Sequence, residues 1–278
     1  MKQPTSLHQH ENYARAVRRL GGCSHWYNTE CGPVLGIERR KLGLTFLWAA
    51  GLPQRVNLPP ANVTIFNMCH SVSRPAWTIR VSKGVETALW DIRPDIIQLR
   101  SGLSQKWRNR LARAERSGLE MIADELPADP NHWLLTKAQE HGRICGYRGW
   151  PPAMTAAYAA DPKASLLVQT ADKSAAMLFL RHGIGATYHI GWRAIDAPVG
   201  VHNLILWQAI MMLKVEGIQI IDLGTLPKSN KGLCHFKLGT GAHVQPTGDT
   251  FFKLRIGQEK SRRSGGFSKK VSGLIQPP

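Results

Sequence analysis

The stretch of residues 203–237, NLILWQAIMMLKVEGIQIIDLGTLPKSNKGLCHFK, decides the fold that the sequence predicts. Its first part is apolar on nearly every side and predicts a helix over 203–216, ended by the glycine that follows. The next four residues, 218–221, predict a short buried strand that leads into Asp222. After a second glycine turn, a phenylalanine directly precedes Lys237. A helix leading into a buried strand, with a lone lysine beside an aromatic residue after it, is one way of building an acyl-transfer site at a strand end.

Three strand patterns precede this helix and one follows it. The apolar runs 164–170, 175–181 and 187–192 are joined by short turns, which predicts a meander. Residues 250–254 predict a final strand. Because helix 203–216 is apolar nearly all round, we expect it to lie between two layers of the structure.

Further strands are predicted in the N-terminal third. Residues 34–38 and 42–48 flank the basic turn 39–41 and predict a hairpin. Strands are also predicted at 63–68 and at 77–81, the second one half-buried because its apolar and polar residues alternate.

A basic helix is predicted between Leu103 and Gly118, where apolar residues recur at helical spacing beside a cationic stripe. The apolar stripe holds Leu103, Trp107, Leu111 and Ala114, and the cationic stripe holds Lys106, Arg110 and Arg113. A strand at 119–122 and helices at 129–140 and 153–159 follow. This order of elements predicts an α/β protein, of the α+β kind, with a mixed sheet layered by helices.

The composition and net charge of the chain limit the classes of partner that it is expected to bind. The chain has 278 residues, of which 43% are hydrophobic, so it can bury a sizeable core. Its formal net charge of +17 favours an anionic partner such as nucleic acid, a membrane surface or a phosphorylated substrate, with general solubility as the alternative. Residues 258–278 carry basic side chains among Ser and Gly, which predicts a flexible basic tail.

Cysteine usage and hydropathy suggest a compartment. The five cysteines are scattered without a Cys-x-x-Cys pair, so we expect reduced thiols and no metal site. The N-terminus has no apolar signal run, and the most apolar helix is far shorter than the about 20 residues that span a bilayer. These features predict a cytoplasmic protein with no integral membrane segment.

Two stretches, taken together, resemble the FemAB family of peptidyltransferases, the aminoacyl-transferring branch of the GNAT acyltransferase superfamily. The first is the basic helix 103–118, which ends in an alanine, a charged pair and a glycine. The second combines three motifs: Asn203-Leu204-Ile205-Leu206-Trp207, then Ile221-Asp222-Leu223-Gly224, then Phe236-Lys237 followed by Gly239. They stand in the family's order and rough spacing, and the resemblance covers residues 90–255.

The resemblance implies a GNAT-like fold of two tandem units, a shortened N-terminal one over 1–160 and a C-terminal one over 161–257. It implies a bacterial acyltransferase that moves an aminoacyl or other acyl group onto an amine of a cell-envelope precursor, as in peptidoglycan synthesis. The donor would be aminoacyl-tRNA. No cofactor is expected, and the pyrophosphate loop of acetyl-CoA-dependent relatives is missing from the sequence, which weakens the coenzyme A alternative.

Three residues are the expected catalytic groups. Fixed positive charge can stabilise the oxyanion of acyl transfer, and the resemblance implies this role for Lys237, with a surface lysine on a strand as the alternative. Asp222 is the first candidate for the base that takes a proton from the acceptor amine, the alternative being a turn cap on Gly224. His235 is the next candidate because an imidazole titrates near neutral pH, and His189 and His202 stay open on the same ground.

The expected substrate-binding residues are Phe236, Tyr188, Asn203, Lys106, Arg108, Arg110 and Arg113. The phenylalanine would wall the aminoacyl pocket or belong to the core, the tyrosine would hold the acyl carbonyl or pack in the sheet, and the asparagine would face the pocket or cap its helix. The four cations fit the phosphates of a tRNA acceptor stem or of a nucleotide or lipid diphosphate acceptor, or else form a solvated face.

Two rival interpretations remain from the sequence. One is an acyl-CoA- or acyl-carrier-dependent N-acyltransferase of the same fold, acting on a polysaccharide or small molecule. The other, from the charge alone, is a nucleic-acid-binding module without catalysis. An enzyme predicts that Lys237 and Asp222 converge in a cleft, and a binding module predicts a continuous positive surface. The expected partners are therefore an aminoacyl-tRNA or acyl-CoA donor and an anionic acceptor, with peripheral membrane contact as a further option.

Overall fold

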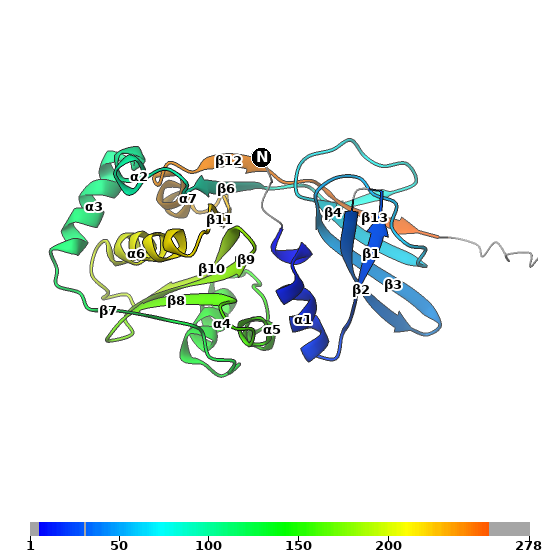
Figure 1. Cartoon of the computed structure of the whole chain (residues 1–278), viewed down its shortest axis with the longest axis horizontal. Helices are drawn as coiled ribbons and strands as arrows, with labels where there is room; N and C mark the ends of the chain where they lie inside the picture. The colour runs from blue at the N-terminus through cyan, green and yellow to red at the C-terminus, as the bar shows by residue number, and fades with distance from the viewer. Residues whose placement is uncertain (1–5, 31, 256–278) are drawn as a thin grey trace, which may run out of the picture.

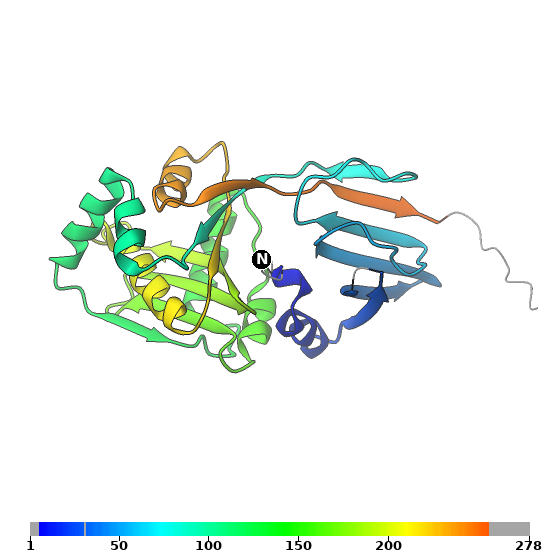
Figure 2. The same cartoon turned by 45° about the horizontal axis from the view of Figure 1, so that its top comes forward.

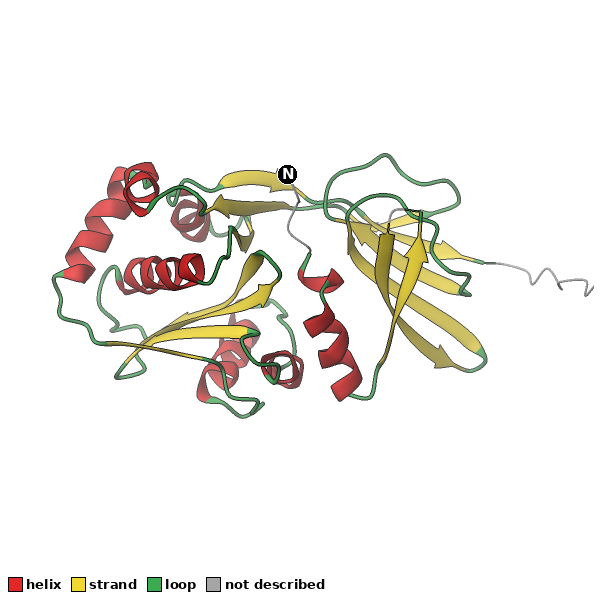
Figure 3. Cartoon of the chain, viewed as in Figure 1, coloured by secondary structure: helices red, strands yellow, loops and turns green. Residues whose placement is uncertain are grey.

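The computed structural model describes residues 6–30 and 32–255, which build two mixed sheets with a short helical segment between them (Figure 1). The tail predicted at 258–278 lies outside the described residues. Helices gather around the seven-stranded sheet, whereas the six-stranded sheet is flanked mostly by loops (Figure 3). The two halves therefore bury their apolar residues in different ways.

The six-stranded sheet has the order β1-β2-β3-β4-β13-β5. Its strands are β1 Cys23–Thr29, β2 Gly32–Lys41, β3 Leu44–Leu52, β4 Val63–Met68, β5 Ile79–Ser82 and β13 Thr250–Leu254. The predicted hairpin is confirmed as β2–β3, and the predicted strands 63–68 and 250–254 are β4 and β13. The strand predicted at 77–81 forms as β5, but the half-burial expected of it is wrong. β5 is an edge strand that pairs with β13 on one side, and it is exposed along its whole length.

The seven-stranded sheet has the order β12-β6-β11-β10-β9-β8-β7. Its strands are β6 Glu86–Asp91, β7 Met121–Asp124, β8 Ser165–Thr170, β9 Ala175–His182, β10 Gly185–Arg193, β11 Ile220–Thr225 and β12 His243–Pro246. The predicted meander is confirmed, since β8, β9 and β10 pair antiparallel in sequence order. β10 and β11 pair in parallel, which requires a crossover, and the long apolar helix provides it.

The helices are η1 Leu7–Gln9, α1 Glu11–Arg19, α2 Ile96–Gly102, α3 Gln105–Glu115, α4 Trp133–Cys145, α5 Pro152–Ala159, α6 Val201–Val215 and α7 Lys231–Leu238. One face of the seven-stranded sheet packs against α6, which α3 covers in turn, so α6 lies between layers as predicted. The other face packs against α4 and α5. Both faces of this sheet are therefore covered.

Two local predictions near the candidate site need correction. Residues 232–237 lie within the helix α7, whereas the sequence suggested a glycine turn there and offered a strand only as the alternative setting of Lys237. Asn203 does not cap its helix, because α6 begins two residues earlier, after Gly200. Gly200 has a φ of 91°, and a Cβ there would lie 2.4 Å from the carbonyl oxygen of Arg110, so only glycine fits where α6 meets α3.

The η1–α1 segment joins the two sheets. The side-chain amide of Gln9 donates to the carbonyl oxygens of Leu35 (3.1 Å) and Ala50 (2.8 Å) in the six-stranded sheet. On the other side Arg19 pairs with Asp161 at 2.6 Å. The unit boundary expected at residue 160 lies between α5 and β8, within the part of the chain that builds the seven-stranded sheet. Among the described residues, no helix is long and apolar enough to cross a membrane.

Candidate active site

The seven-stranded sheet loses its regular pairing where β10 and β11 part. The parallel ladder runs from Gly185 opposite Ile220 to Thr187 opposite Asp222 and stops there, although β10 continues along β9. β10 has an irregular register directly after Tyr188, and the pairing of β11 with β6 is irregular after Asp222. Such irregularities re-aim side chains and free backbone groups, and they are common beside active sites.

Lys237 lies at this point, in the last turn of α7, with only 4% of the residue exposed. Its Nζ donates a 2.7 Å hydrogen bond to the carbonyl oxygen of Thr225 at the end of β11, and it lies 5.9 Å from the ring centroid of Tyr188. Burial lowers its pKa from 10.5 to about 8, although the charge of Asp222 opposes that shift. An ammonium has three N–H donors, so Nζ retains donors for a substrate oxygen.

Asp222 lies beside Lys237 on β11 and is partly buried. Its Oδ1 accepts a 2.7 Å hydrogen bond from the backbone N–H of Gly224. Burial raises the pKa of the carboxyl, and both this hydrogen bond and the charge of Lys237 oppose the rise. The turn cap that the sequence offered as an alternative is therefore present, but it uses one carboxylate oxygen only.

Aromatic residues brace α7 against the sheet and against α3. The indole Nε1 of Trp107 donates a 3.1 Å hydrogen bond to the backbone carbonyl of Phe236, and their rings stack at 6.1 Å between centroids. Phe236 is partly buried and packs against the main core, and Tyr188 packs its ring against Phe179 at 5.8 Å. Burial raises the pKa of Tyr188, so its hydroxyl stays protonated. The apolar stripe of the basic helix thus fixes the helix that carries Lys237.

Asn203 is 3% exposed, and its Nδ2 has no hydrogen-bond partner in the described part of the chain. A buried amide donor without a protein partner costs free energy, so it requires a partner such as an ordered water or a ligand. The structure places this donor in the first turn of α6, the crossover helix between β10 and β11.

The structure does not bring the histidines to Lys237. His235 is exposed, because residues two apart on a helix point to opposite sides and Lys237 takes the buried side of α7. His189 is the extra residue in the irregular part of β10, and its Nε2 lies 2.9 Å from the hydroxyl of Thr155. Burial lowers its pKa to about 4. His202 lies 3.1 Å through Nε2 from the carbonyl of Trp192, and burial lowers its pKa too.

The four candidate phosphate-binding cations on α3 have two different roles. Arg108 is used inside the fold, since its guanidinium donates to the carbonyls of Ser101 (2.8 Å) and Leu103 (2.6 Å) at the end of α2. The other three cations line a surface groove of about 540 Å³ that contains no acidic residue. Its lining is Gln105, Lys106, Asn109, Arg110, Arg113 and Val199.

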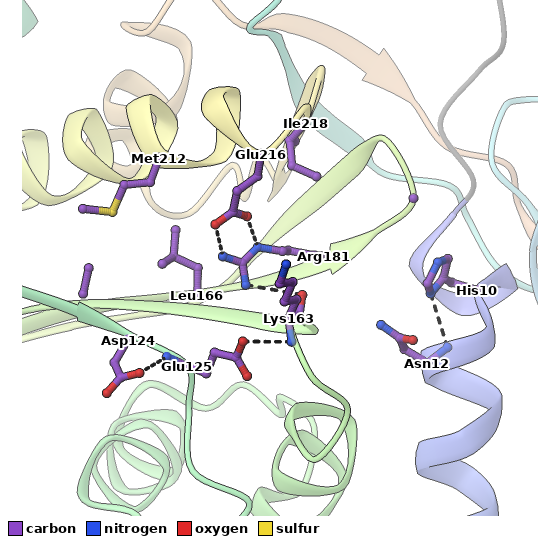
Figure 4. Close-up of a pocket in the computed structure, with 12 residues that line it drawn as sticks. His10, Asn12, Asp124, Glu125, Lys163, Leu166, Arg181, Met212, Glu216 and Ile218 are labelled. Atoms are coloured by element: carbon purple, nitrogen blue, oxygen red, sulfur yellow. Dashed lines mark hydrogen bonds and ion pairs between the residues drawn. The ribbon is translucent and has the colours of Figure 1, made fainter.

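A larger cavity of about 690 Å³ lies at the starting ends of β10 and β11, away from Lys237 (Figure 4). Two of its charged side chains, Arg181 and Glu216, form an ion pair at 2.6 Å, and Glu125 accepts the backbone N–H of Lys163 at 2.9 Å. Neither this cavity nor the groove on α3 is lined by Lys237 or Asp222. The charge of Asp222 acts on Lys237, but the cleft lined by both residues that we expected of an enzyme is neither of these two cavities.

Two contributors to the site could not be recognised in the sequence. Thr225 acts through its backbone carbonyl, which no side-chain pattern marks. The hydrogen bond of Trp107 joins residues 129 positions apart in the chain, and the helical pattern indicated only that this tryptophan is buried. No group of three or more His, Cys, Asp or Glu side chains that could hold a metal ion occurs within residues 6–30 and 32–255.

No protein-family model and no curated protein matches this sequence. Solved structures match its fold. A crystal structure of FemX aligns with a TM-score of 0.69 at 9% identity, covering 91% of this chain and 93% of FemX. The C-terminal domain of a putative lysylphosphatidylglycerol synthetase from Agrobacterium fabrum aligns with a TM-score of 0.52 at 16% identity, covering 90% and 89%. L-PGS from Bacillus licheniformis aligns with a TM-score of 0.51 at 11% identity, covering 92% and 93%.

This chain shares its fold with FemX. The predicted α/β class and the resemblance to the FemAB-like branch are confirmed at the level of the fold. At such low identity the likeness carries no residue roles, so those rest on the geometry of the site itself.

Proposed function

We propose that this chain is an acyltransferase that moves an aminoacyl group from aminoacyl-tRNA to an amine of a cell-envelope precursor. The observation that carries the proposal is the buried ammonium of Lys237 beside Asp222, at the point where β10 and β11 part. The fold shared with FemX, with the domain of a putative lysylphosphatidylglycerol synthetase and with L-PGS supports the class of reaction.

The reaction joins the acceptor nitrogen to the ester carbonyl carbon of the donor. As the C–N bond forms, the carbonyl oxygen becomes an oxyanion, and the free N–H donors of Lys237 stabilise it by several kcal/mol. Asp222 accepts the proton that the nitrogen loses, through the oxygen that Gly224 does not use. The C–O bond then breaks, and the proton that Asp222 took passes to the leaving oxygen, so that the tRNA departs as the alcohol. The raised pKa of the carboxyl brings it closer to a base that works near neutral pH.

The groove on α3 would hold the phosphates of the donor. Lys106, Arg110 and Arg113 supply positive charge without a neighbouring carboxylate in the lining. α3 also carries Trp107, which holds the backbone of α7 one residue before Lys237. Phosphate binding and the catalytic lysine are thus supported by adjoining sides of one helix.

Substrate must reach a lysine that is closed off in this structure. Because Lys237 is 4% exposed, productive binding requires a shift of α7 or of the segment that follows β11. The unpaired amide donor of Asn203 would then find its partner on the acyl group or on the acceptor.

The test offers the purified chain two donors separately, a mixture of radiolabelled aminoacyl-tRNAs and acetyl-CoA, each with a pool of amine acceptors. We expect label from aminoacyl-tRNA in a base-stable amide product. Transfer from acetyl-CoA alone would replace the donor in this proposal, and transfer from neither would reject an acyltransferase.

A further inference from the structure

The outer end of the six-stranded sheet exposes large apolar side chains among cations. Figures 1 and 2 show that β13 ends on the side of this sheet that lies farthest from the seven-stranded sheet. The strand register places the β2–β3 turn, the start of β4, the end of β13 and the start of β5 at this same end. The exposed apolar residues here are Leu42 (91%), Leu44 (44%), Trp77 (91%), Ile79 (62%) and Leu254 (50%).

Two of these residues occupy backbone conformations that large side chains rarely adopt. Leu42 has a φ of 51° and Trp77 a φ of 57°, and both are 91% exposed. A turn that only had to be soluble would favour glycine or asparagine in this left-handed region. Here a leucine and a tryptophan are held out into solvent at a cost in local conformation.

Cations surround the exposed apolar side chains. Five basic residues at this end are exposed and form no ion pair with a described residue: Arg39, Arg40, Lys41, Lys253 and Arg255. No Asp or Glu occurs in the four segments that meet here, 39–46, 62–65, 76–80 and 252–255. The positive charge of this surface is therefore complementary to an anionic partner. Its exposed apolar side chains can be removed from water only if that partner also has an apolar region.

The apolar surface continues inward from the tips. A row of partly or fully exposed apolar side chains crosses five strands in direct register: Ile37, Trp48, Ile65, Phe252 and Ile79. Five neighbouring strands span about 20 Å. A surface of this width, apolar with a cationic rim, matches the chemistry of an anionic membrane interface.

We propose that the outer end of the six-stranded sheet docks on an anionic phospholipid surface. Leu42 and Trp77 would enter the boundary between headgroups and acyl chains, and the five cations would contact lipid phosphates. Leucine and isoleucine make poor partners for stacked bases, so RNA fits the groove on α3 better than it fits this end. Docking here leaves the candidate active site on the other sheet free, and the inference does not depend on the proposed reaction.

The experiment is sedimentation of the full chain with vesicles, which needs no turnover. Vesicles of equal parts phosphatidylglycerol and phosphatidylcholine should carry the protein down, and vesicles of phosphatidylcholine alone should not. The double variant Leu42→Asn and Trp77→Asn should bind anionic vesicles about tenfold more weakly or worse, because two apolar side chains no longer leave water. Asparagine tolerates the left-handed conformation, so folding should be preserved.

Control variants test whether the loss of vesicle binding is specific to this end of the six-stranded sheet. Ile144→Asn and Ile195→Asn change residues that are 83% and 101% exposed elsewhere and should bind like the wild type. Replacing Arg39, Arg40 and Lys41 by glutamine should lower the affinity by about fivefold per charge. Three results would overturn the proposal: no binding of the wild type to anionic vesicles, undiminished binding of the Leu42/Trp77 variant, or a loss of tRNA binding by that variant without a loss of vesicle binding.

Discussion

The seven-stranded sheet buries apolar residues on both faces, whereas the six-stranded sheet leaves a wide apolar area in contact with solvent. β8 and β9 are almost wholly buried between α6 on one face and α4 and α5 on the other. In the six-stranded sheet a small core forms around Phe66 and Phe251, and Trp48 on the opposite face is 41% exposed.

This difference explains why the candidate active site lies where it does. Keeping a lysine buried with its pKa lowered costs free energy, and only rigid surroundings can hold it in place. The doubly covered sheet provides those surroundings for Lys237, which is fixed through Trp107, Phe236 and Thr225. The other sheet has no comparable buried charge among its core residues and presents surfaces instead.

The largest expected effect is a difference in turnover between two Asp→Asn variants, one made in each sheet. In Asp222→Asn the amide oxygen can still accept the N–H of Gly224, but the base is lost, so turnover should fall by about 10² or more. The control is Asp249→Asn in the turn before β13, where the carboxylate similarly accepts the N–H of Gly84 at 2.8 Å. Its turnover should match the wild type in the same assay, and equal losses in both variants would show that Asp222 has only a turn role.

A pH profile tests the state of Lys237. Turnover should decline by up to about tenfold per pH unit as pH rises beyond about 8, where the buried ammonium loses its proton. Lys237→Arg keeps its charge, so its profile should lack this alkaline decline, whatever its plateau. A decline that persists in the arginine variant would assign it to another group.

The same shift fixes the direction of a change in stability. Lys237 has a pKa of about 8 when folded and 10.5 as its ordinary value, so between these values the unfolded chain binds more protons. The free energy of unfolding should therefore rise with pH across this window, and urea titrations of Lys237→Met should not show that contribution.

A smaller effect is expected at the groove on α3. Arg110→Gln with Arg113→Gln should raise KM for aminoacyl-tRNA by about tenfold with little change in kcat, since the two cations contact phosphates and not the reacting atoms. The variant should also weaken the salt dependence of KM. Arg143→Gln, an exposed change on α4, is the control, and an equal rise there would mean that net charge alone matters.

The sequence predicted those parts of the fold that local patterns specify. The hairpin β2–β3, the meander and the apolar crossover helix follow from periodicity and turn residues, and each forms as expected. The role of β5 as an exposed edge strand depends on which strands lie next to it, and α7 depends on its packing against α3. Such long-range contacts leave no mark on the local pattern, so both were misjudged.

The candidate site, like the fold, contains residues that the sequence could identify and contacts that it could not. Lys237 and Asp222 could be named because their residue types and their places after a buried strand suit acyl transfer. The hydrogen bond of Lys237 to the carbonyl of Thr225 involves no side-chain signal, and the commitment of Arg108 to the end of α2 becomes visible only once the helices pack. His235 points away from the buried side of α7, which Lys237 occupies, because both residues belong to one helix.

The central claim is that Lys237 acts on the reacting carbonyl, and one comparison tests it most directly. Single-turnover transfer from aminoacyl-tRNA should be measured for the wild type, for Lys237→Ala and for Lys231→Ala on the exposed start of α7, together with donor binding for each. We predict that Lys237→Ala binds the donor within a few-fold of the wild type but transfers about 10²-fold more slowly, and that Lys231→Ala is unchanged. Transfer by a folded Lys237→Ala protein at the wild-type rate would contradict the account.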